Sequence, residues 1–220
     1  MSWTAYDDPE VARKMTAGAL AELSRWIGGD HEFHEPWKVF CGFMDYIKTP
    51  GYNMSRNFLD VGCAAAYYYP ILKLHQGWFW NYQGIERSQP LRELAFSVFG
   101  VRAHPSIGDA RSHGAMITSN EPIEYHQWQI VLSGSMLQHE EDWGESLAEQ
   151  IGVCDRWLII HKIPIADTLV QRQKQAYGVT MNEWNFPVAL INEKVGRKPV
   201  DEHYFATAEP HWSGLYDLEA

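Results

Sequence analysis

Three acidic residues follow short apolar stretches at intervals that would bring them together in a folded chain. Asp60 closes the first stretch, Glu86 ends the next one along the chain, and Asp109 comes after a third. A carboxylate in the second position can accept hydrogen bonds from both hydroxyls of a ribose, and one in the third can accept from an exocyclic amine such as that of adenine. Together they indicate a site for an adenosine-containing cofactor, although each one alone would be read as a turn or cap residue.

A turn of small residues directly follows Asp60. Residues 57–61 read as a buried strand, and the stretch from Gly62 to Ala66 leads into a helical pattern. The first N–H groups of such a helix have no partner within it and face a ligand beyond the end of the strand. Small side chains let that ligand approach the backbone closely, and Asp60 can orient the loop or receive a cationic group. The residues expected to contact the cofactor here are Gly62, Cys63 and Ala64.

Apolar stretches and helical patterns alternate along the middle of the chain. Beyond the first strand, the patterns predict strands over 79–86, 101–107, 129–133 and 156–161, and helices over 67–75, 88–99 and 142–151. Such alternation is typical of a parallel sheet with helices on both faces. In a sheet of this kind the ligand binds beyond the carboxyl ends of the strands. The polar residues expected at those ends are Asp60, Glu86, Asp109, Ser133 and His161.

Two helices are predicted ahead of the sheet. The first is bounded by Asp8 as its N-cap, Pro9 in its first turn and Gly28 at its end. The second covers residues 36–47 and ends before a proline. We expect the pair to form a cap over the edge of the sheet or over the ligand cleft.

The end of the chain departs from the alternation. Residues 168–185 are polar and aromatic without clean periodicity and are expected to cover the cleft, and a helix is predicted over 187–195. Two final strands, over 201–208 and 211–218, are expected to be antiparallel at the sheet edge. Because no repeat or linker interrupts the chain, we expect a single domain over residues 1–220. Its parts are a helical cap (1–50), a cofactor-binding core (57–164), and a segment of substrate cover and edge strands (165–220).

Two histidines are expected near the ends of the fourth and fifth strands. His139 precedes carboxylates at positions 140–142, which can raise its pKa or fix its tautomer. Imidazole is the natural general base near neutral pH, and a hydroxyl nucleophile usually needs such a base within about 2.6–3.2 Å. His139 and His161 are therefore the candidate catalytic residues. The alternative for His139 is that it only opens the following helix.

A third histidine-containing stretch runs from His31 to Glu35. His-x-x-His flanked by carboxylates can bind a metal, but no further ligands follow at convincing spacing. A solvated loop is the preferred interpretation, so we predict no metal site.

The composition is that of a folded protein that does not bind polyanions. The formal net charge of −10 argues against nucleic acids and anionic membranes, because both are bound through Lys and Arg. The three cysteines are scattered and odd in number, which favours a reducing compartment. The N-terminus has no signal-peptide pattern, and no apolar run approaches the roughly 20 residues that span a bilayer. We therefore expect a cytoplasmic protein.

Several motifs resemble those of class I S-adenosylmethionine-dependent methyltransferases. They are Leu59-Asp60-Val61-Gly62-Cys63, Gly84-Ile85-Glu86, Gly108-Asp109-Ala110, and Ile130-Val131-Leu132-Ser133 with Leu137-Gln138-His139. The resemblance covers about half of the chain, from Asn57 to Pro164. The family often has Gly-x-Gly-x-Gly in its first motif, whereas this chain has alanines at positions 64 and 66. That change is expected either to be tolerated, to weaken cofactor binding, or to mark a relative without activity.

The resemblance implies a fold and an assignment of the site. The fold is a three-layer, Rossmann-like α/β sandwich with a mostly parallel, seven-stranded sheet, an antiparallel edge strand and the N-terminal helices as a cap. In the site, the methionine part of S-adenosylmethionine lies near Asp60 and Gly62, and the ribose lies on Glu86. The adenine lies near Asp109 and Ala110, and Ser133 borders the transferable methyl group.

The function expected from these observations is methyl transfer to a hydroxyl, or an amine, of a small molecule or sugar. The partners expected are a small-molecule or glycan acceptor, with no nucleic acid and no membrane, and a homodimer is left open. The alternative is a domain that binds an adenosine cofactor without catalysis and serves a partner or regulatory role. A nicotinamide-dependent dehydrogenase ranks lower, because it normally needs a fuller glycine motif closer to the N-terminus.

Overall fold

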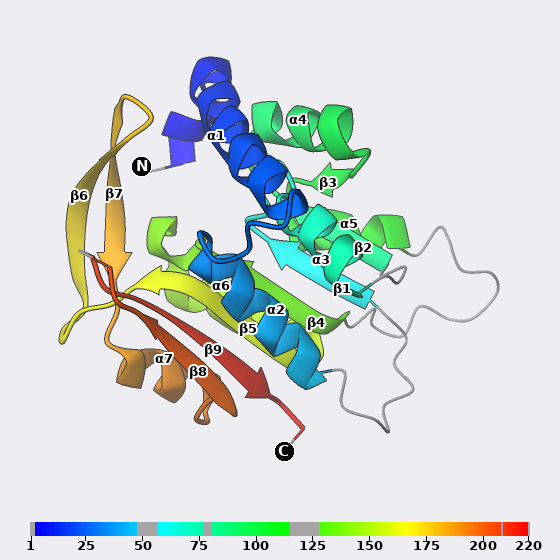
Figure 1. Ribbon diagram of the computed structural model, residues 1–220. Coiled ribbons are helices and arrows are strands. Elements are labelled where there is room, and N and C mark those ends of the chain that lie inside the picture. The colour runs from blue at the N-terminus through cyan, green and yellow to red at the C-terminus, as the bar shows by residue number, and fades with distance from the viewer. Residues whose placement is uncertain (1–2, 48–56, 77–80, 115–127, 208, 220) are drawn as a thin grey trace.

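A sheet of seven strands forms the centre of the molecule (Figure 1). The computed structural model describes residues 3–47, 57–76, 81–114, 128–207 and 209–219. Within the sheet the strand order is β3-β2-β1-β4-β5-β9-β8. The strands are β1 (Asn57–Val61), β2 (Asn81–Ile85), β3 (Ala103–His104), β4 (Trp128–Gly134), β5 (Cys154–Pro164), β8 (Asp201–Phe205) and β9 (His211–Asp217).

The sheet is parallel except for its last strand along the chain. β1 pairs in parallel with β2 and with β4, and β4 pairs in parallel with β5. β9 runs antiparallel to both β5 and β8, so β9 lies one place inside the edge that β8 forms. The predicted mostly parallel, seven-stranded sheet with an antiparallel strand at this end is confirmed.

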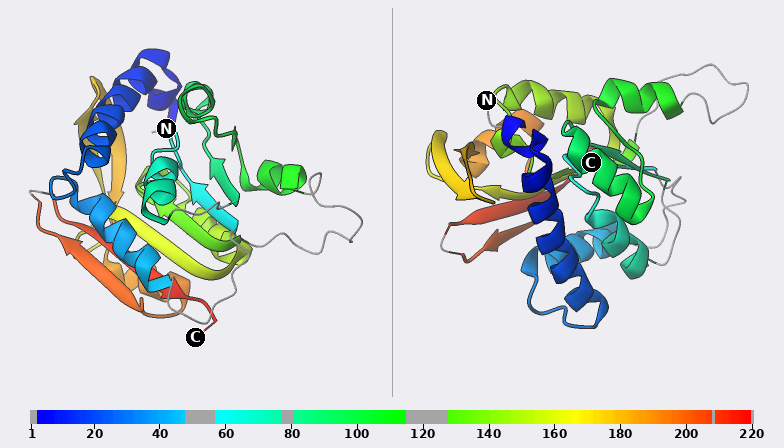
Figure 2. Two further views of the ribbon diagram at one scale, coloured as in Figure 1. Left: turned by 45° about the vertical axis from the view of Figure 1, so that its right-hand side comes forward. Right: turned by 90° about the horizontal axis from the view of Figure 1, so that it is seen from above.

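Helices cover both faces of the sheet. They are η1 (Trp3–Asp7), α1 (Pro9–Ile27), α2 (Glu35–Ile47), α3 (Tyr68–Gln76), α4 (Gln89–Phe99), α5 (Ile107–Gly114), η2 (Leu137–His139), α6 (Trp143–Val153) and α7 (Val188–Val195). Ile130 and Leu132 pack with α2 and α3 on one face, while Val131 packs with α6 and α7 on the other. This alternation along β4 gives the three layers predicted from the sequence, which Figure 2 shows edge-on in its right-hand view. None of the helices in the described segments is long and apolar enough to cross a membrane.

The N-terminal helices begin and end where the sequence predicts. The Asp8 carboxylate accepts a hydrogen bond of 2.7 Å from the Glu10 N–H, Pro9 occupies the first turn of α1, and Gly28 follows its last residue. These contacts satisfy backbone groups that the helix itself leaves without partners. In the same way Ser88 caps the start of α4, and Gly100, in a left-handed conformation, follows its end.

The third strand is shorter than predicted. β3 is confined to Ala103–His104, and α5 begins three residues after it. Pro105 has no N–H for strand pairing. Ser106 then caps the helix, because its Oγ accepts from the Asp109 N–H at 3.1 Å and donates to the Asp109 carboxylate at 2.5 Å. Asp109 therefore lies in the first turn of a helix. The predicted strand over 101–107 is confirmed only at Ala103–His104 and was wrong at its other residues. Residues 79–80 of the predicted strand over 79–86 and residue 208 of the predicted strand over 201–208 lie outside the described residues.

A hairpin that the sequence did not predict stands apart from the main sheet. β6 (Val170–Ala176) and β7 (Val179–Asn185) pair antiparallel as a separate two-stranded sheet. The two residues between them, Tyr177 and Gly178, both have positive φ, which is the geometry of a tight hairpin turn. Tyr-Gly lacks the usual Asn or Asp signal for such a turn, and the polar strand residues hide the pattern.

Candidate functional site

A cavity of about 440 Å³ lies beyond the carboxyl ends of β1, β4 and β5. Gly62, Gly134 and Lys162 form its wall at the strand ends, and side chains from η1, α1 and the β6–β7 hairpin enclose it. Figure 1 shows β1 and β5 pointing toward the region that α1 and the hairpin flank. The volume is in the range of small-molecule sites, and a parallel sheet of this type binds ligands at this edge. Residues of the segment 168–185 line the cavity, and that this segment covers a bound substrate stays a prediction.

The turn after β1 is held against the end of β2. The N–H groups of Gly62 and Cys63 both donate to the Ile85 carbonyl, at 2.8 and 2.9 Å. Gly62 has a φ of 76°, and a Cβ added there would lie 2.6 Å from the Cβ of Met136. Gly62 is therefore required both for the backbone conformation and for the close approach of the β4–η2 connection.

Gly62→Ala is expected to lower the free energy of unfolding by about 2–4 kcal/mol, as the sum of a left-handed alanine and a steric overlap. Gly100→Ala is the matched control, because Gly100 also has a positive φ (70°) but no atom within 4 Å of an added Cβ. The control is expected to lose only about 1 kcal/mol. Urea unfolding of the two variants measures the difference, and equal losses would contradict the packing argument.

The alanines that replace the family's usual glycines keep a glycine-like backbone. Ala64 has a φ of 49° and Ala66 a φ of 62°, and both are buried. The Cys63 side chain is accommodated by the neighbouring strand, since a Cβ on Gly84 would lie 2.6 Å from the Cys63 Sγ. Cys63 and Ala64 both lie on the cavity wall, and their contact with a cofactor stays a prediction.

Glu86 reaches this turn from the end of β2. One of its carboxylate oxygens accepts from the Ala64 N–H at 3.0 Å and the other from the Ser88 N–H at 2.8 Å. Burial raises the pKa of the carboxyl, and these two backbone donors oppose the shift. Each oxygen keeps a second lone pair, and Glu86 lines the cavity. It can therefore accept further hydrogen bonds from a ligand that lies against the turn.

Asp60 is fully buried at the carboxyl end of β1. Its Oδ2 accepts a hydrogen bond of 2.5 Å from the Tyr82 hydroxyl, and its Oδ1 has no partner among the described residues. Burial is the main cause that raises the pKa of Asp60 to about 7, and nearby Glu86 adds to the rise. A buried polar atom without a partner is uncommon. This one lies behind the bare backbone of Gly134 on the cavity wall.

The remaining predicted cofactor residues lie away from the large cavity. Ser133 is fully buried within the sheet, and the wall at this point is formed by Gly134 and Ser135 instead. Asp109 is exposed on α5, and Ala110 packs under that helix. A smaller cavity of about 60 Å³ beside Glu86 is lined by residues 105–107 rather than by 109–110. A contact of Asp109 or Ala110 with adenine stays a prediction.

His161 does not face the cavity, which corrects its assignment as a candidate base. Its ring is fully buried, lies edge-on to Phe40 and Tyr68, and shares a hydrogen bond of 3.0 Å between Nδ1 and the Ser213 Oγ. Burial lowers the pKa of His161 to about 3. The register of β5 shifts between Ile160 and Ile163, and this irregularity turns the next residue, Lys162, to the cavity instead.

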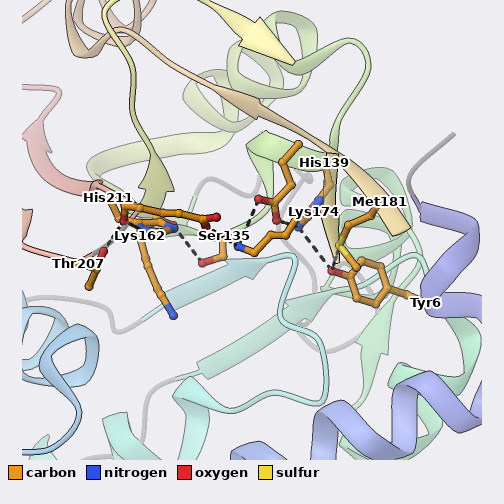
Figure 3. A network of polar contacts seen from close by, with 10 residues as sticks. Tyr6, Ser135, His139, Lys162, Lys174, Met181, Thr207 and His211 are labelled. Carbon is orange, nitrogen blue, oxygen red and sulfur yellow. Dashed lines mark hydrogen bonds and ion pairs between the residues drawn. The ribbon is translucent and has the colours of Figure 1, made fainter. Parts of the chain in front are cut away.

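His139 does line the cavity, at the end of η2 (Figure 3). Its Nε2 lies 3.5 Å from the Tyr6 hydroxyl and 3.6 Å from the Glu183 Oε1. Burial, followed by the positive charge of Lys174, lowers the pKa of His139 to about 4, so the ring is neutral at pH 7. The contact with Glu183 becomes an ion pair only when His139 gains a proton.

The polar residues around His139 were not identified from the sequence. Tyr6 comes from η1, Lys174 from β6 and Glu183 from β7, and Lys174 lies 3.3 Å from the Glu183 carboxylate. They are far apart in the chain, and only the unpredicted hairpin and the packing of η1 bring them to one cavity. One signal for the contribution of β7 was available in the sequence, namely the alternation of its side chains. Met181 and Glu183 are buried, and Thr180 is exposed.

The stretch from His31 to Glu35 has a structural role between α1 and α2. The His34 Nε2 lies 3.2 Å from the Glu22 carboxylate, and its Nδ1 accepts from the Trp37 N–H at 3.2 Å. His31 stacks on Trp26. Across the described segments, no group of three or more Asp, Glu, His and Cys side chains is placed to hold a metal ion.

Known proteins share the architecture of this chain without clear sequence similarity. No family model and no curated protein matches the sequence. Among solved structures, an S-adenosylmethionine-dependent methyltransferase from Clostridium acetobutylicum matches with a TM-score of 0.58 and 11% identity, over 92% of this chain and 98% of that one. An amino pentose methyltransferase from Micromonospora echinaspora, involved in calicheamicin biosynthesis and bound to S-adenosylmethionine, matches with a TM-score of 0.53 and 13% identity, over 89% and 96%.

A third structure is the magnesium protoporphyrin IX methyltransferase of Synechocystis with bound S-adenosylmethionine. It matches with a TM-score of 0.52 and 12% identity, over 82% of this chain and 76% of that one. At these identities the likeness is one of fold. The chain therefore has the fold of the class I S-adenosylmethionine-dependent methyltransferases.

Proposed function

We propose that this protein is a cytoplasmic S-adenosylmethionine-dependent methyltransferase that acts on a hydroxyl, or an amine, of a small molecule or sugar. The observation that carries the proposal is the cavity at the carboxyl ends of β1 and β4, which joins a bare backbone turn, a buried acceptor and a neutral histidine. The structures that share the fold are described as methyltransferases, and the amino pentose enzyme acts on a sugar.

The residues of this cavity fit the cofactor. The backbone of Gly62 and Cys63 leaves room for a ligand at the turn, and the carboxylate of Glu86 suits the hydroxyls of a ribose. Asp60 is fully buried behind Gly134 and does not line the cavity, but its Oδ1 has no partner among the described residues, and we assign it to the amino group of methionine. When bound, S-adenosylmethionine supplies an electrophilic methyl group.

The rest of the cavity suits a hydroxyl acceptor. His139 is unprotonated at neutral pH and can accept the proton that a hydroxyl loses as it is methylated. The resulting imidazolium would lie beside the Glu183 carboxylate, which stabilises the positive charge. The hairpin and η1 surround His139 and keep water from this side, so the protein holds the acceptor in place and desolvates it. An amine acceptor would need only to arrive without its extra proton.

A non-catalytic cofactor-binding domain is the second candidate. One observation favours it: the Ala64 methyl group occupies the cavity wall where a glycine would leave the backbone bare. The two functions differ in turnover. Calorimetric titration with S-adenosylmethionine, followed by a screen of hydroxyl and amine acceptors, separates them. Binding with methyl transfer to an acceptor supports the enzyme, binding without transfer to any acceptor supports the second candidate, and absence of binding contradicts both.

Glu86→Gln is expected to raise the Kd for S-adenosylhomocysteine by roughly 10- to 100-fold, since a hydrogen bond to a charged group contributes about 1.5–3 kcal/mol. Glutamine keeps an acceptor oxygen for only one of the two backbone donors, so urea unfolding of the variant is measured beside its Kd to show that the turn is retained. Glu93→Gln, on the exposed face of α4, is the matched control and is expected to leave the Kd unchanged. Equal affinities of the two variants would contradict the ribose assignment.

A further inference from the structure

Lys162 is held in an unusual backbone conformation at the end of β5. Its φ is 54°, in the left-handed region, where β5 and β9 lose register between Ile160 and Ile163. The Lys162 N–H donates to the Ser213 Oγ at 2.9 Å, and its carbonyl accepts from the Ser135 Oγ at 3.3 Å. A left-handed conformation is unfavourable for a residue that carries a side chain. Such strain persists where the surrounding structure fixes it, most often at functional sites.

The consequence of this conformation is that the Lys162 side chain enters the cavity. It is half-buried, and Figure 3 shows its amino group pointing away from the polar contacts drawn around it. In the part of the chain that the structure describes, this amino group forms no hydrogen bond and no ion pair. The other lysine of the cavity differs, because Lys174 pairs with Glu183 at 3.3 Å and with Glu209 at 3.6 Å.

The titratable side chains that face Lys162 contact other groups rather than its amino group. Glu22 on α1 lies 3.2 Å from the His34 Nε2, and Glu183 on β7 pairs with Lys174. His211 on β9 shares a hydrogen bond of 2.7 Å with the Glu209 carbonyl, and burial lowers the pKa of its ring. Burial likewise lowers the pKa of the Lys162 ammonium, and the positive charge of Lys174 adds to this shift, whereas the Glu22 and Glu183 carboxylates oppose it. These carboxylates act from a distance, and among the described residues none is in ion-pair contact with the Lys162 amino group.

An ammonium withdrawn from water without a partner in direct contact is unfavourable, and a ligand carboxylate that contacts it reduces this cost. The hydrogen bonds formed by an ammonium with an anionic oxygen are also the strong ones. We propose that Lys162 binds the carboxylate of a small molecule held in this cavity, and thereby selects ligands that carry an acid group. This inference rests on the proposed function. The carboxylate comes either from the amino-acid end of the cofactor or from an acidic acceptor.

The first arm of the test asks about the cofactor. S-adenosylhomocysteine and 5′-methylthioadenosine share the nucleoside and the sulfur, but only the former carries the amino acid. If the cofactor supplies the carboxylate, Lys162→Met is expected to raise the Kd for S-adenosylhomocysteine by roughly 10- to 100-fold and to leave that for methylthioadenosine unchanged. Lys194→Met, on the exposed side of α7 across the sheet, is the matched control. Lys162→Arg, which keeps the charge, is expected to restore most of the affinity.

The second arm asks about the acceptor. Matched acids and neutral analogues, namely glucuronate with glucose and 4-hydroxybenzoate with 4-hydroxybenzamide, are titrated into the protein with and without S-adenosylhomocysteine. If the acceptor supplies the carboxylate, the acid of a pair binds at least about 10-fold more tightly than its analogue, and Lys162→Met removes this preference. The inference is overturned if Lys162→Met alters neither the affinity for S-adenosylhomocysteine nor any preference for an acid. Failure of wild-type protein to bind S-adenosylhomocysteine at all would instead contradict the proposed function.

Discussion

His139→Ala is expected to lower kcat for a hydroxyl acceptor by roughly 10²- to 10⁴-fold, the usual contribution of a positioned general base. The affinity for S-adenosylhomocysteine should change little, because His139 lies on the acceptor side of the cavity with Tyr6 and Glu183. A low pKa of about 4 keeps the imidazole unprotonated at neutral pH. If the wild-type protein catalyses this transfer, a plot of its kcat/KM against pH should therefore fall only at acid pH, where the His139 ring gains its proton.

The control for this prediction is His203→Ala. His203 lies on β8, outside the cavity, and pairs with Glu35 at 2.9 Å. The His203→Ala variant is expected to have the same kcat for the hydroxyl acceptor as the wild type. His139→Gln, which keeps the size and polarity but not the basicity, separates a loss of base from a loss of packing. If His139→Ala or His139→Gln methylates the hydroxyl acceptor as fast as the wild type, His139 is not the base.

Asp60→Asn is expected to change the pH dependence of stability by about 4 kcal/mol between pH 4 and pH 8. Burial raises the pKa of Asp60 from 3.8 in the unfolded chain to about 7 in the folded protein. A carboxyl with a raised pKa contributes stability that is fully present below pH 3.8 and is lost as the pH rises through 7. Asparagine does not titrate, so the variant lacks this loss. Relative to the wild type, it should therefore gain stability as the pH rises.

Urea unfolding of both proteins at the two pH values measures this effect. The asparagine amide leaves a buried donor in place of the carboxyl oxygen, which costs about 1–3 kcal/mol at either pH. The buried histidines also titrate in this range, but they do so in both proteins and cancel from the comparison. A stability difference between Asp60→Asn and wild type that is the same at pH 4 and pH 8 would show that Asp60 is ionised normally.

Local signals made most of the fold predictable. Caps such as Asp8 and Ser88 mark helix starts through hydrogen bonds to nearby backbone groups, so sequence alone identifies them. The continuous apolar run of β5 indicates burial on both faces. The third strand was predicted too long because the helix that Ser106 and Asp109 cap has little apolar periodicity. An acidic residue after a short apolar stretch fits both the end of a strand and the first turn of a helix.

The site was only partly predictable for a related reason. Asp60, Gly62 and Glu86 lie at the ends of neighbouring strands, so the topology brings them together. His161 was assigned to the cavity by strand position alone, and the register shift in β5 that presents Lys162 instead depends on pairing with β9. The contacts of η1 with η2 and with β7 join residues more than a hundred positions apart, and no local pattern encodes them.

A crystal structure of the protein with S-adenosylhomocysteine tests the central claim most directly. The account predicts the ligand in the cavity beyond β1, with its thioether chain along the turn at Gly62 and its ribose hydroxyls hydrogen-bonded to Glu86. A ligand bound elsewhere on the molecule, or a ribose that makes no contact with Glu86, would contradict it.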